Sequence, residues 1–155
     1  MKRFFPVLAL VLSAGTAQSD CAPHRVTVIG DWGRAAFNVA IADDPDERAR
    51  GLMFVEEMPT MAGMLFIYEA PQITSFWMMN TLIPLDMLFA DAAGRIVTVH
   101  ENAVPQDLTS IRGGDNIQFV LEINGGMSRR LGIVPGDALQ HPAIGPDAVA
   151  PCPAG

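Results

Sequence analysis

The sequence lacks an apolar run long enough to cross a membrane as a helix. Its longest run, residues 4–14, covers roughly eleven positions, whereas a transmembrane helix needs about 20. Lys2 and Arg3 precede this run and the small residues of GTAQS follow it, which is the three-part pattern of a cleavable signal peptide. We expect cleavage after Ser19, or two residues earlier. Residues 1–19 would then be removed, and residues 20–155 would form one exported globular domain.

Positive charge is also scarce. The chain has 10 Lys and Arg residues against 17 Asp and Glu residues, a formal net charge of −7. Loss of Lys2 and Arg3 with the signal peptide would change this charge to −9 and leave arginine as the only permanent cation. A chain this acidic is repelled by phosphate backbones and by anionic lipid. We therefore expect a small molecule or another protein as the partner, and no nucleic acid.

Cysteine is limited to Cys21 and Cys152, close to the two ends of the expected mature chain. An even number of cysteines in an exported protein favours a disulfide, and the ends of a domain often lie close together. Metal binding is the competing use, but the sequence has no CxxC motif and no nearby pair of histidines. We predict a Cys21–Cys152 disulfide and no metal site.

Common catalytic and cofactor motifs are missing. The sequence has no nucleophile elbow, HExxH motif, phosphate-binding loop or dinucleotide fingerprint. With both cysteines in a disulfide, no thiol remains to act as a nucleophile. These absences favour a protein that is not an enzyme and holds no cofactor.

Short apolar segments bounded by Gly, Pro, Asp or Asn predict strands through most of the chain. The segment DDPDERARGLM instead predicts a short helix that Asp44 caps, Pro45 begins and Gly51 ends, and GMSRRLG predicts at most two helical turns. The expected class is mainly β (α+β), a compact and strongly bent antiparallel sheet or small barrel with one or two short helices. The Pro-rich tail, residues 141–155, is expected to be irregular. The predicted strands lie near residues 26–29, 36–42, 63–69, 73–79, 117–123 and 136–140, with two more within 84–104.

Five blocks of the sequence follow one another in the order ERARGLMF, GMLFIYE, SFWMMNTLIPLDMLF, DAAGRIVTVHENAVP and FVLEINGGMSRRLGIVPGD. Together they resemble the bacterial and archaeal domain of unknown function 192 family over residues 37–134. The resemblance implies a compact, mainly β single domain, often exported, and it implies no reaction. The chain departs from the family pattern where Met79 replaces a frequent Lys and Val55 a frequent Arg.

One carboxylate, Asp86, interrupts the apolar segment SFWMMNTLIPLDMLF. If the turn DAAG pairs Asp91 with Arg95, the register of the hairpin puts Asp86 opposite His100. Such a pair can orient a proton, supply two metal ligands, or simply satisfy two half-buried polar groups. A one-residue change of register would separate the two side chains.

Several other side chains qualify as site residues or as ordinary structural residues. Asn80 either forms a turn or points a donor into a pocket, and Trp77 either fills the core or lines a site. Glu101 and Glu122 alternate with apolar neighbours, so we expect both to face solvent, although Glu101 is also a candidate third group beside His100. The predicted binding residues are Trp77, Asn80, Asp86, His100 and Glu101.

The leading functional hypothesis is a small exported binding or accessory domain with a polar-aromatic pocket for an unknown ligand. One alternative is a hydrolase or metal-dependent enzyme that uses Asp86 and His100. A second alternative is a periplasmic Cu(I)-binding protein, because thioether sulfur is a ligand for Cu(I). Its methionines would be Met58, Met61, Met64, Met78 and Met79.

Overall fold

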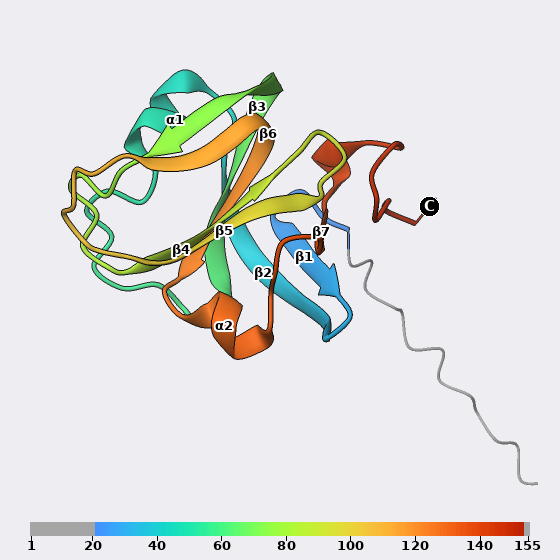
Figure 1. Cartoon of the computed structure of the whole chain (residues 1–155), viewed down its shortest axis with the longest axis horizontal. Helices are drawn as coiled ribbons and strands as arrows, with labels where there is room; N and C mark the ends of the chain where they lie inside the picture. Colours follow the sequence, from blue (N-terminus) through green and yellow to red (C-terminus); the bar gives the residue numbers. More distant parts are fainter. Residues whose placement is uncertain (1–20, 154–155) are drawn as a thin grey trace, which may run out of the picture.

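The computed structural model describes residues 21–153, which form one strongly curled seven-stranded sheet (Figure 1). The strand order is β5-β4-β6-β3-β2-β1-β7. The predicted mainly β class with two short helices is confirmed. The strands are β1 Arg25–Gly30, β2 Gly33–Ala42, β3 Ala62–Phe76, β4 Leu85–Ala90, β5 Ile96–Ala103, β6 Ile111–Asn124 and β7 Ala138–Gln140.

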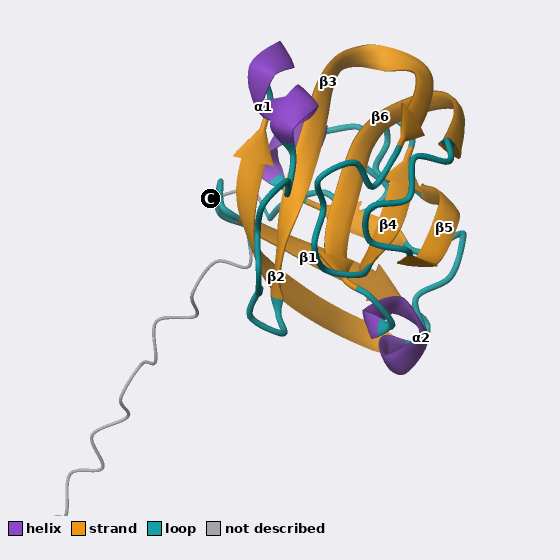
Figure 2. Cartoon of the chain, turned by 90° about the vertical axis from the view of Figure 1, so that its left-hand side faces the viewer, coloured by secondary structure: helices purple, strands orange, loops and turns teal. Residues whose placement is uncertain are grey.

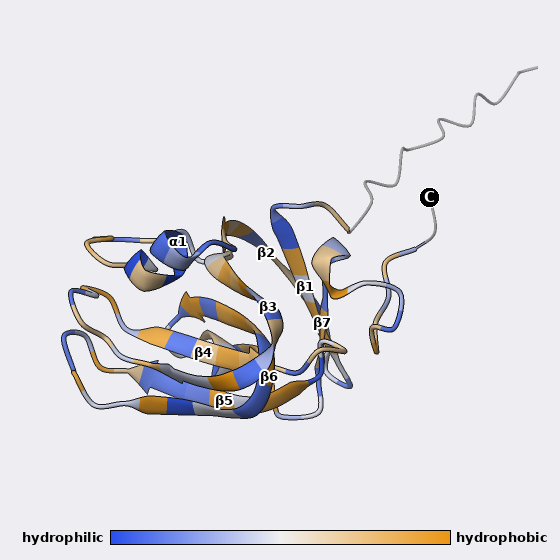
Figure 3. Ribbon diagram, turned by 90° about the horizontal axis from the view of Figure 1, so that it is seen from above, coloured by the Kyte–Doolittle hydropathy of each residue, from blue (hydrophilic) through white to orange (hydrophobic). Residues whose placement is uncertain are grey.

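The two α-helices, α1 (Pro45–Arg50) and α2 (Met127–Leu131), lie at opposite ends of the sheet (Figure 2). α1 begins and ends where the sequence predicts. The Asp44 carboxylate accepts a hydrogen bond from the Glu47 N–H at 2.8 Å, Pro45 is the first helical residue, and Gly51 ends the helix. α1 buries none of its side chains, and Figure 3 shows it as mainly hydrophilic. Its stability therefore depends on its caps.

Replacement of Asp44 by Ala is expected to lower the free energy of unfolding by about 0.5–2 kcal/mol, because the Glu47 N–H loses its acceptor. Asp46→Ala is the matched control, since Asp46 lies in the first turn of α1 but makes no capping bond. It should cost only a few tenths of a kcal/mol through the helix dipole, roughly 0.3. Urea denaturation measures both variants, and equal losses would contradict the capping role.

The sheet contains one parallel strand pair. Every other named pair is antiparallel, as predicted, but β2 and β3 run parallel with Ile41 opposite Leu65. A parallel pair requires a crossover connection, and here the segment between β2 and β3 provides it and carries α1. β3 is also longer than expected: it joins the two predicted strands 63–69 and 73–79 into one irregular strand that ends at Phe76.

The register of the β4–β5 hairpin differs from the prediction. The hairpin starts as expected, since the Asp91 N–H donates to the Arg95 carbonyl. An irregularity at Val97 then shifts the register by one residue, so that His100 lies opposite Met87 and not opposite Asp86. The predicted Asp86–His100 pairing is therefore wrong, because a bulge inserts one residue into β5.

The core consists of two apolar clusters, and β4 contributes to both. Leu88 and Ala90 belong to the first cluster, whereas Leu85, Met87 and Phe89 belong to the second. Successive side chains of a strand point to opposite faces, so β4 is covered on both sides and all six of its residues are buried. This double burial explains the nearly continuous apolar sequence LDMLFA.

The two edges of the sheet meet at one end. The Ile96 N–H donates to the Asp137 carbonyl and the Leu139 N–H donates to the Gly94 carbonyl, each at 2.8 Å. These bonds connect the start of β5 to β7, the strand at the other edge of the sheet. The sheet is thereby curled into a half-barrel, and the edges are partly protected from pairing with other chains.

The two ends of the described chain are joined covalently. Cys21 and Cys152 form the predicted disulfide, with a Cα–Cα distance of 5.8 Å across a sequence separation of 131 residues. His141 adds a second connection, because its Nδ1 accepts from the Ala143 N–H, which leaves Nε2 to donate to the Pro23 carbonyl at 3.0 Å. The C-terminal segment also contains a short 3-10 helix, η1 (Pro142–Ile144), and is less irregular than predicted.

Joint replacement of Cys21 and Cys152 by Ser should destabilise the protein by about 2–4 kcal/mol, because the unfolded chain is no longer closed into a long loop. Thermal denaturation of this variant and of the reduced parent measures the effect. Equal midpoints for the oxidised parent and the double variant would contradict it. Since no free cysteine exists among the described residues, reduction should affect this bond alone.

Candidate functional site

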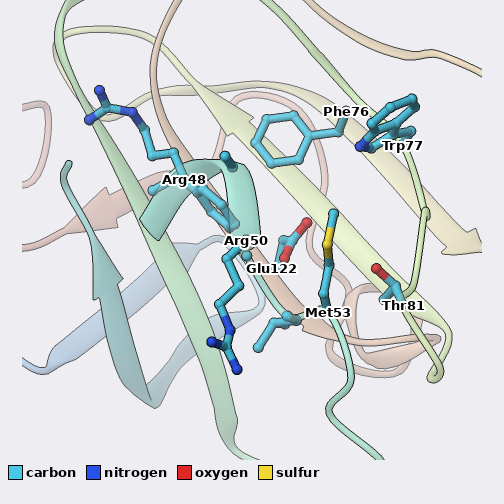
Figure 4. A pocket seen from close by; sticks show the side chains of 11 residues that line it. Arg48, Arg50, Met53, Phe76, Trp77, Thr81 and Glu122 are labelled. Atoms are coloured by element: carbon cyan, nitrogen blue, oxygen red, sulfur yellow. The ribbon is translucent and has the colours of Figure 1, made fainter. Parts of the chain in front are cut away.

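A small cavity lies between α1, the end of β3 and the C-terminal part of β6 (Figure 4). Its volume is about 40 Å³, and one buried water molecule occupies roughly 10–15 Å³ on the same measure. The cavity therefore has room for a group of only a few non-hydrogen atoms. It is lined by Arg48, Ala49, Arg50, Gly51, Leu52, Met53, Phe66, Phe76, Trp77, Thr81 and Glu122.

The carboxyl group of Glu122 faces this cavity from β6 (Figure 4). Glu122 pairs with Met64 of β3 on one side and with Met87 of β4 on the other, and it is 4% exposed. Within residues 21–153 its side chain has no hydrogen bond and no ion pair. Burial disfavours the charged form and raises the pKa of the Glu122 carboxyl from 4.5 to about 8.

Arg48, one of the two arginines that line the cavity, is held by other groups. Its guanidinium donates to the carbonyls of Asp43 and Ile67 and pairs with Glu69 at 3.2 Å. It also lies 5.0 Å from the centre of the Tyr68 ring. In Figure 4 the guanidinium groups of Arg48 and Arg50 both point away from Glu122. Neither arginine neutralises the buried carboxyl group.

Aromatic rings form one wall of the cavity. Phe66 and Phe76 meet edge to face with ring centres 5.0 Å apart, and Phe76 meets Phe89 in the same way at 5.6 Å. These contacts fix the Phe76 ring, since edge-to-face pairs are favourable. Trp77 continues the wall outward and is 49% exposed. The cavity thus has an apolar side that extends to the protein surface.

The loops beside the cavity contain unusual backbone conformations. Phe54, Asn80 and Gln106 all have positive φ, at 65°, 53° and 65°. The Phe54 N–H donates to the Asn80 carbonyl at 2.8 Å, and the Gln106 N–H donates to the Thr81 carbonyl at 3.2 Å. Positive φ is costly for a bulky residue and persists only where other contacts hold the backbone. Here these cross-loop hydrogen bonds hold it, and Asn80 serves as a turn residue.

The structure does not bring the predicted binding residues into one cavity. Trp77 lines the cavity over Glu122, whereas His100 and Glu101 line a separate groove beside Arg112 with a volume of about 410 Å³. Glu101 pairs there with Arg129 at 2.6 Å. Asp86 is completely buried. The expectation that these residues share one pocket is wrong, because the sheet register separates them.

Asp86 accepts four hydrogen bonds from protein groups. Its Oδ1 accepts from the N–H groups of Asn102 and Gly126, and its Oδ2 accepts from the N–H and the hydroxyl of Ser128, all between 2.5 and 2.8 Å. α2 has no capping side chain of its own, because its N-cap residue is Gly126. Asp86 supplies that cap from the neighbouring strand and joins β4, β5 and α2. This arrangement leaves the hydrolase hypothesis without its proposed acid–base pair.

The methionines of the copper hypothesis are distributed over the core. Met61 packs against the first apolar cluster, whereas Met58, Met64 and Met78 belong to or pack against the second. Met78 is completely buried. These positions suit the role of methionine as a flexible core residue, and the surface group of sulfurs on which the hypothesis depends is not formed by them.

Glu122 is not among the predicted binding residues, because its alternation with apolar neighbours in the sequence predicts a side chain that faces solvent. β6 is in fact covered on both faces in this region, and residues 119–123 are all buried. The apolar residues on both sides of Glu122 in FVLEI were the available signal, since a strand buried on both faces has an apolar run without alternation.

The DUF192 family model, described as an uncharacterised ACR, matches residues 26–141, and the chain belongs to this family. Two solved structures are similar. A protein of unknown function from Novosphingobium aromaticivorans is 39% identical, with a TM-score of 0.73 over 84% of this chain and 98% of that chain. A protein from Sinorhizobium meliloti, proposed to be a transcription regulator, is 40% identical, with a TM-score of 0.73 over 81% and 96%. No protein with a curated description matches the chain.

Proposed function

We propose that this protein is a small exported binding domain whose ligand enters the cavity over Glu122. The observation that carries the proposal is a carboxyl group, 4% exposed, that faces an aromatic-walled cavity without a hydrogen bond or ion pair from the described residues. Buried polar groups in proteins nearly always have partners. A ligand that supplies the missing partner would bind here with a specific orientation, and Phe76 and Trp77 would contact its apolar part.

Export is part of this proposal. The N-terminal pattern is typical of a signal peptide, and a disulfide suits an oxidising compartment. No helix within residues 21–153 is both long enough and apolar enough to span a bilayer. We propose residues 20–155 as the mature domain. N-terminal sequencing of the exported chain tests this boundary, and a first residue other than Asp20 or Gln18 would contradict it.

A small molecule or a protein is the proposed kind of partner. The transcription-regulator role proposed for the Sinorhizobium meliloti relative is not carried over, because the formal net charge of −7 opposes contact with phosphate backbones. Binding to DNA at low salt would contradict this exclusion. A gel-shift titration over a range of salt concentrations measures it directly.

The two tryptophans provide a test of the site. Trp77 lines the cavity, whereas Trp32 lies in the turn between β1 and β2 and donates through Nε1 to Asp137 at 2.8 Å. In a fragment screen followed by NMR, compounds that bind in the cavity should shift the indole N–H signal of Trp77 and leave that of Trp32 unchanged. Glu122→Gln should weaken the binding of these compounds, because the glutamine amide cannot ionise.

Glu101→Gln is the matched control for this screen. It removes a carboxylate of the same size from the separate groove beside His100. The proposal is contradicted if the compounds shift the indole N–H signal of Trp32. It is also contradicted if Glu101→Gln weakens the binding of the compounds and Glu122→Gln does not. The latter result would move the binding site to the His100 groove.

A further inference from the structure

Of the residues that the structure describes, Glu122 is the only acidic residue that lines this cavity. An isolated buried carboxylate is costly, and proteins normally compensate such a group with a cation or with hydrogen-bond donors. Arg48 is committed to Asp43, Ile67 and Glu69, and the Arg50 guanidinium points away in Figure 4. The free protein therefore keeps Glu122 protonated at neutral pH, and a cation that pairs with the Glu122 carboxylate would have to come from a ligand.

We infer that the cavity takes a primary ammonium group on an alkyl chain, with the ammonium at the Glu122 carboxylate and the chain against Phe76 and Trp77. This inference rests on the proposed function and specifies its ligand class. An ammonium group has three N–H donors and a full positive charge. It can therefore satisfy both oxygens of a carboxylate that has no other partner.

The size of the cavity selects among cations. A volume of about 40 Å³ accommodates about three or four water-sized groups. A primary ammonium group, the size of one water molecule, fits with its first methylene groups. A planar guanidinium or a trimethylammonium group requires more space at the same depth. The site should consequently discriminate between primary amines and bulkier cations.

The aromatic wall also favours a cation with an apolar chain. Aromatic faces attract cations within about 6 Å of the ring centre, and Arg48 already uses the Tyr68 ring in this way at 5.0 Å. Phe76 and the half-exposed Trp77 line the path from Glu122 to the surface. An alkyl chain that leaves the ammonium group would be covered by these two rings.

Charged groups around Glu122 give a mixed local field. α1 contributes Arg48 and Arg50, which oppose a cation at the rim, and β3 contributes Tyr68 and Glu69. β4 contributes only uncharged Met87 as the strand partner. The arginine charges are directed outward, and the whole chain has a formal net charge of −7. The long-range field therefore attracts cations.

Binding of an ammonium group must be coupled to loss of a proton. Burial raises the pKa of the Glu122 carboxyl to about 8, so the free protein holds this proton at pH 7. An alkylammonium ion, with a pKa of roughly 10.4, remains charged below pH 9. Formation of the ion pair transfers the Glu122 proton to solvent. At pH 7 about nine-tenths of a proton should be released per ligand bound, and the affinity should rise about ninefold from pH 6 to 7 and about fivefold from pH 7 to 8.

Isothermal titration calorimetry of the mature protein with n-butylamine hydrochloride tests the inference. Titrations at pH 6, 7 and 8, each in two buffers of different ionisation enthalpy, give both affinity and proton release. We expect the stated pH dependence for the parent and for Glu101→Gln. Glu122→Gln should abolish proton release and weaken binding at least tenfold at pH 8. Glu122→Met serves as a second variant without a polar group at this position, and it should behave like Glu122→Gln.

Comparison ligands identify the recognised group and its source. Butyrate, n-butanol and butylguanidinium should bind at least tenfold more weakly than n-butylamine. Nα-acetyl-lysine N-methylamide carries its ammonium group on a lysine side chain, so tighter binding than that of n-butylamine would assign the site to lysine side chains, and weaker binding would assign it to free amines. Tighter binding of butyrate that disappears as the pH rises above 8 would overturn the inference in favour of an anion. So would n-butylamine affinity that is unchanged in Glu122→Gln.

The calorimetry separates this inference from the proposed function. If neutral fragments shift the Trp77 indole signal and depend on Glu122 while n-butylamine does not bind, the cavity is a binding site but its ligand is not an amine. If no fragment affects Trp77, both the proposed function and the ammonium inference are wrong.

Discussion

Glu122→Gln is expected to make the ligand-free protein more stable, by an amount on the order of 3 kcal/mol at pH 7 and nearer 5 kcal/mol at pH 9. The folded protein keeps the Glu122 proton up to a pKa of about 8, whereas the unfolded chain releases it near 4.5. Between these values the folded state binds more protons, so the stability of the parent falls as the pH rises. Glutamine has no proton to lose and lacks this fall.

The unfolding free energies of the two proteins should depend on pH in a specific way. Parent and Glu122→Gln should have similar unfolding free energies below pH 4.5, separate between pH 4.5 and 8, and run parallel above pH 8. Urea denaturation at intervals of one pH unit measures the difference, and Glu101→Gln controls for the loss of a carboxylate elsewhere. A difference that is constant over the whole range would mean that the Glu122 pKa is not raised in the folded state.

Such a large gain from one substitution would identify Glu122 as a residue retained for binding. Residues that serve stability alone are rarely improved by several kcal/mol on a conservative change, whereas binding sites often contain groups that destabilise the free protein. Ligand binding should reduce this difference in stability. With n-butylamine in excess at pH 8, both proteins gain stability by mass action, and the parent should gain at least about 1.4 kcal/mol more than Glu122→Gln, because a tenfold difference in affinity corresponds to that free energy.

Most elements of the fold could be predicted because local signals agreed with the tertiary structure. Asp44, Pro45 and Gly51 set the bounds of α1 through their own backbone preferences, and the disulfide followed from two cysteines near the chain ends. The strand predicted near residues 136–140 is also present, as β7. Signals of this kind depend on residues close together in sequence or on covalent chemistry.

The site was less predictable because it depends on register and on coverage by distant elements. A single irregular residue, Val97, places His100 beside Met87 and separates it from Asp86. The burial of Glu122 depends on β3 and β4 on either side and on the α1 region above it. Alternation within β6 carries no information about that covering region. Only Trp77, of the five predicted binding residues, lines the Glu122 cavity.

The two buried carboxyl groups, Asp86 and Glu122, have opposite environments. Asp86 receives four hydrogen bonds from backbone and hydroxyl donors, and Glu122 receives none from the described residues. Desolvation penalises both, but only Asp86 is compensated within the protein. Asp86 is therefore assigned to folding and Glu122 to ligand binding. Matched substitutions at the two positions should have opposite effects on stability.

Asp86→Asn is expected to lower the free energy of unfolding by about 3–5 kcal/mol, because it breaks a buried network of hydrogen bonds to a charged group. Both carboxylate oxygens accept from two donors each. The amide NH₂ of asparagine would therefore face either the Asn102 and Gly126 N–H groups or the Ser128 N–H. At least one backbone N–H would remain buried without an acceptor.

Two further variants define this effect. Ser128→Ala removes only the hydroxyl donor and should cost about 1–2 kcal/mol. Asp115→Asn removes an exposed carboxylate from an i,i+3 pair with Arg112 and should change stability by no more than about 0.5 kcal/mol. Amide hydrogen exchange should increase most at Gly126 and Ser128, since the helix α2 loses its only capping side chain. A general increase over the whole sheet would indicate global destabilisation without a local role.

Ligand binding separates the structural role of Asp86 from a role in a site. Asp86 and Glu122 occupy adjacent positions of the β4–β6 pair, since Asp86 lies opposite Ile123 and Met87 lies opposite Glu122. Successive side chains point to opposite faces of a sheet, so Asp86 is directed to the cluster that joins β4, β5 and α2, whereas Glu122 is directed to the cavity beside α1. Under conditions where Asp86→Asn is still folded, its n-butylamine affinity and the Trp77 indole shift should equal those of the parent. Full stability together with lost binding would contradict the structural role and return Asp86 to the list of binding residues. Lost stability with unchanged binding is the expected result, because a carboxylate with four protein donors has no acceptor left to offer a ligand.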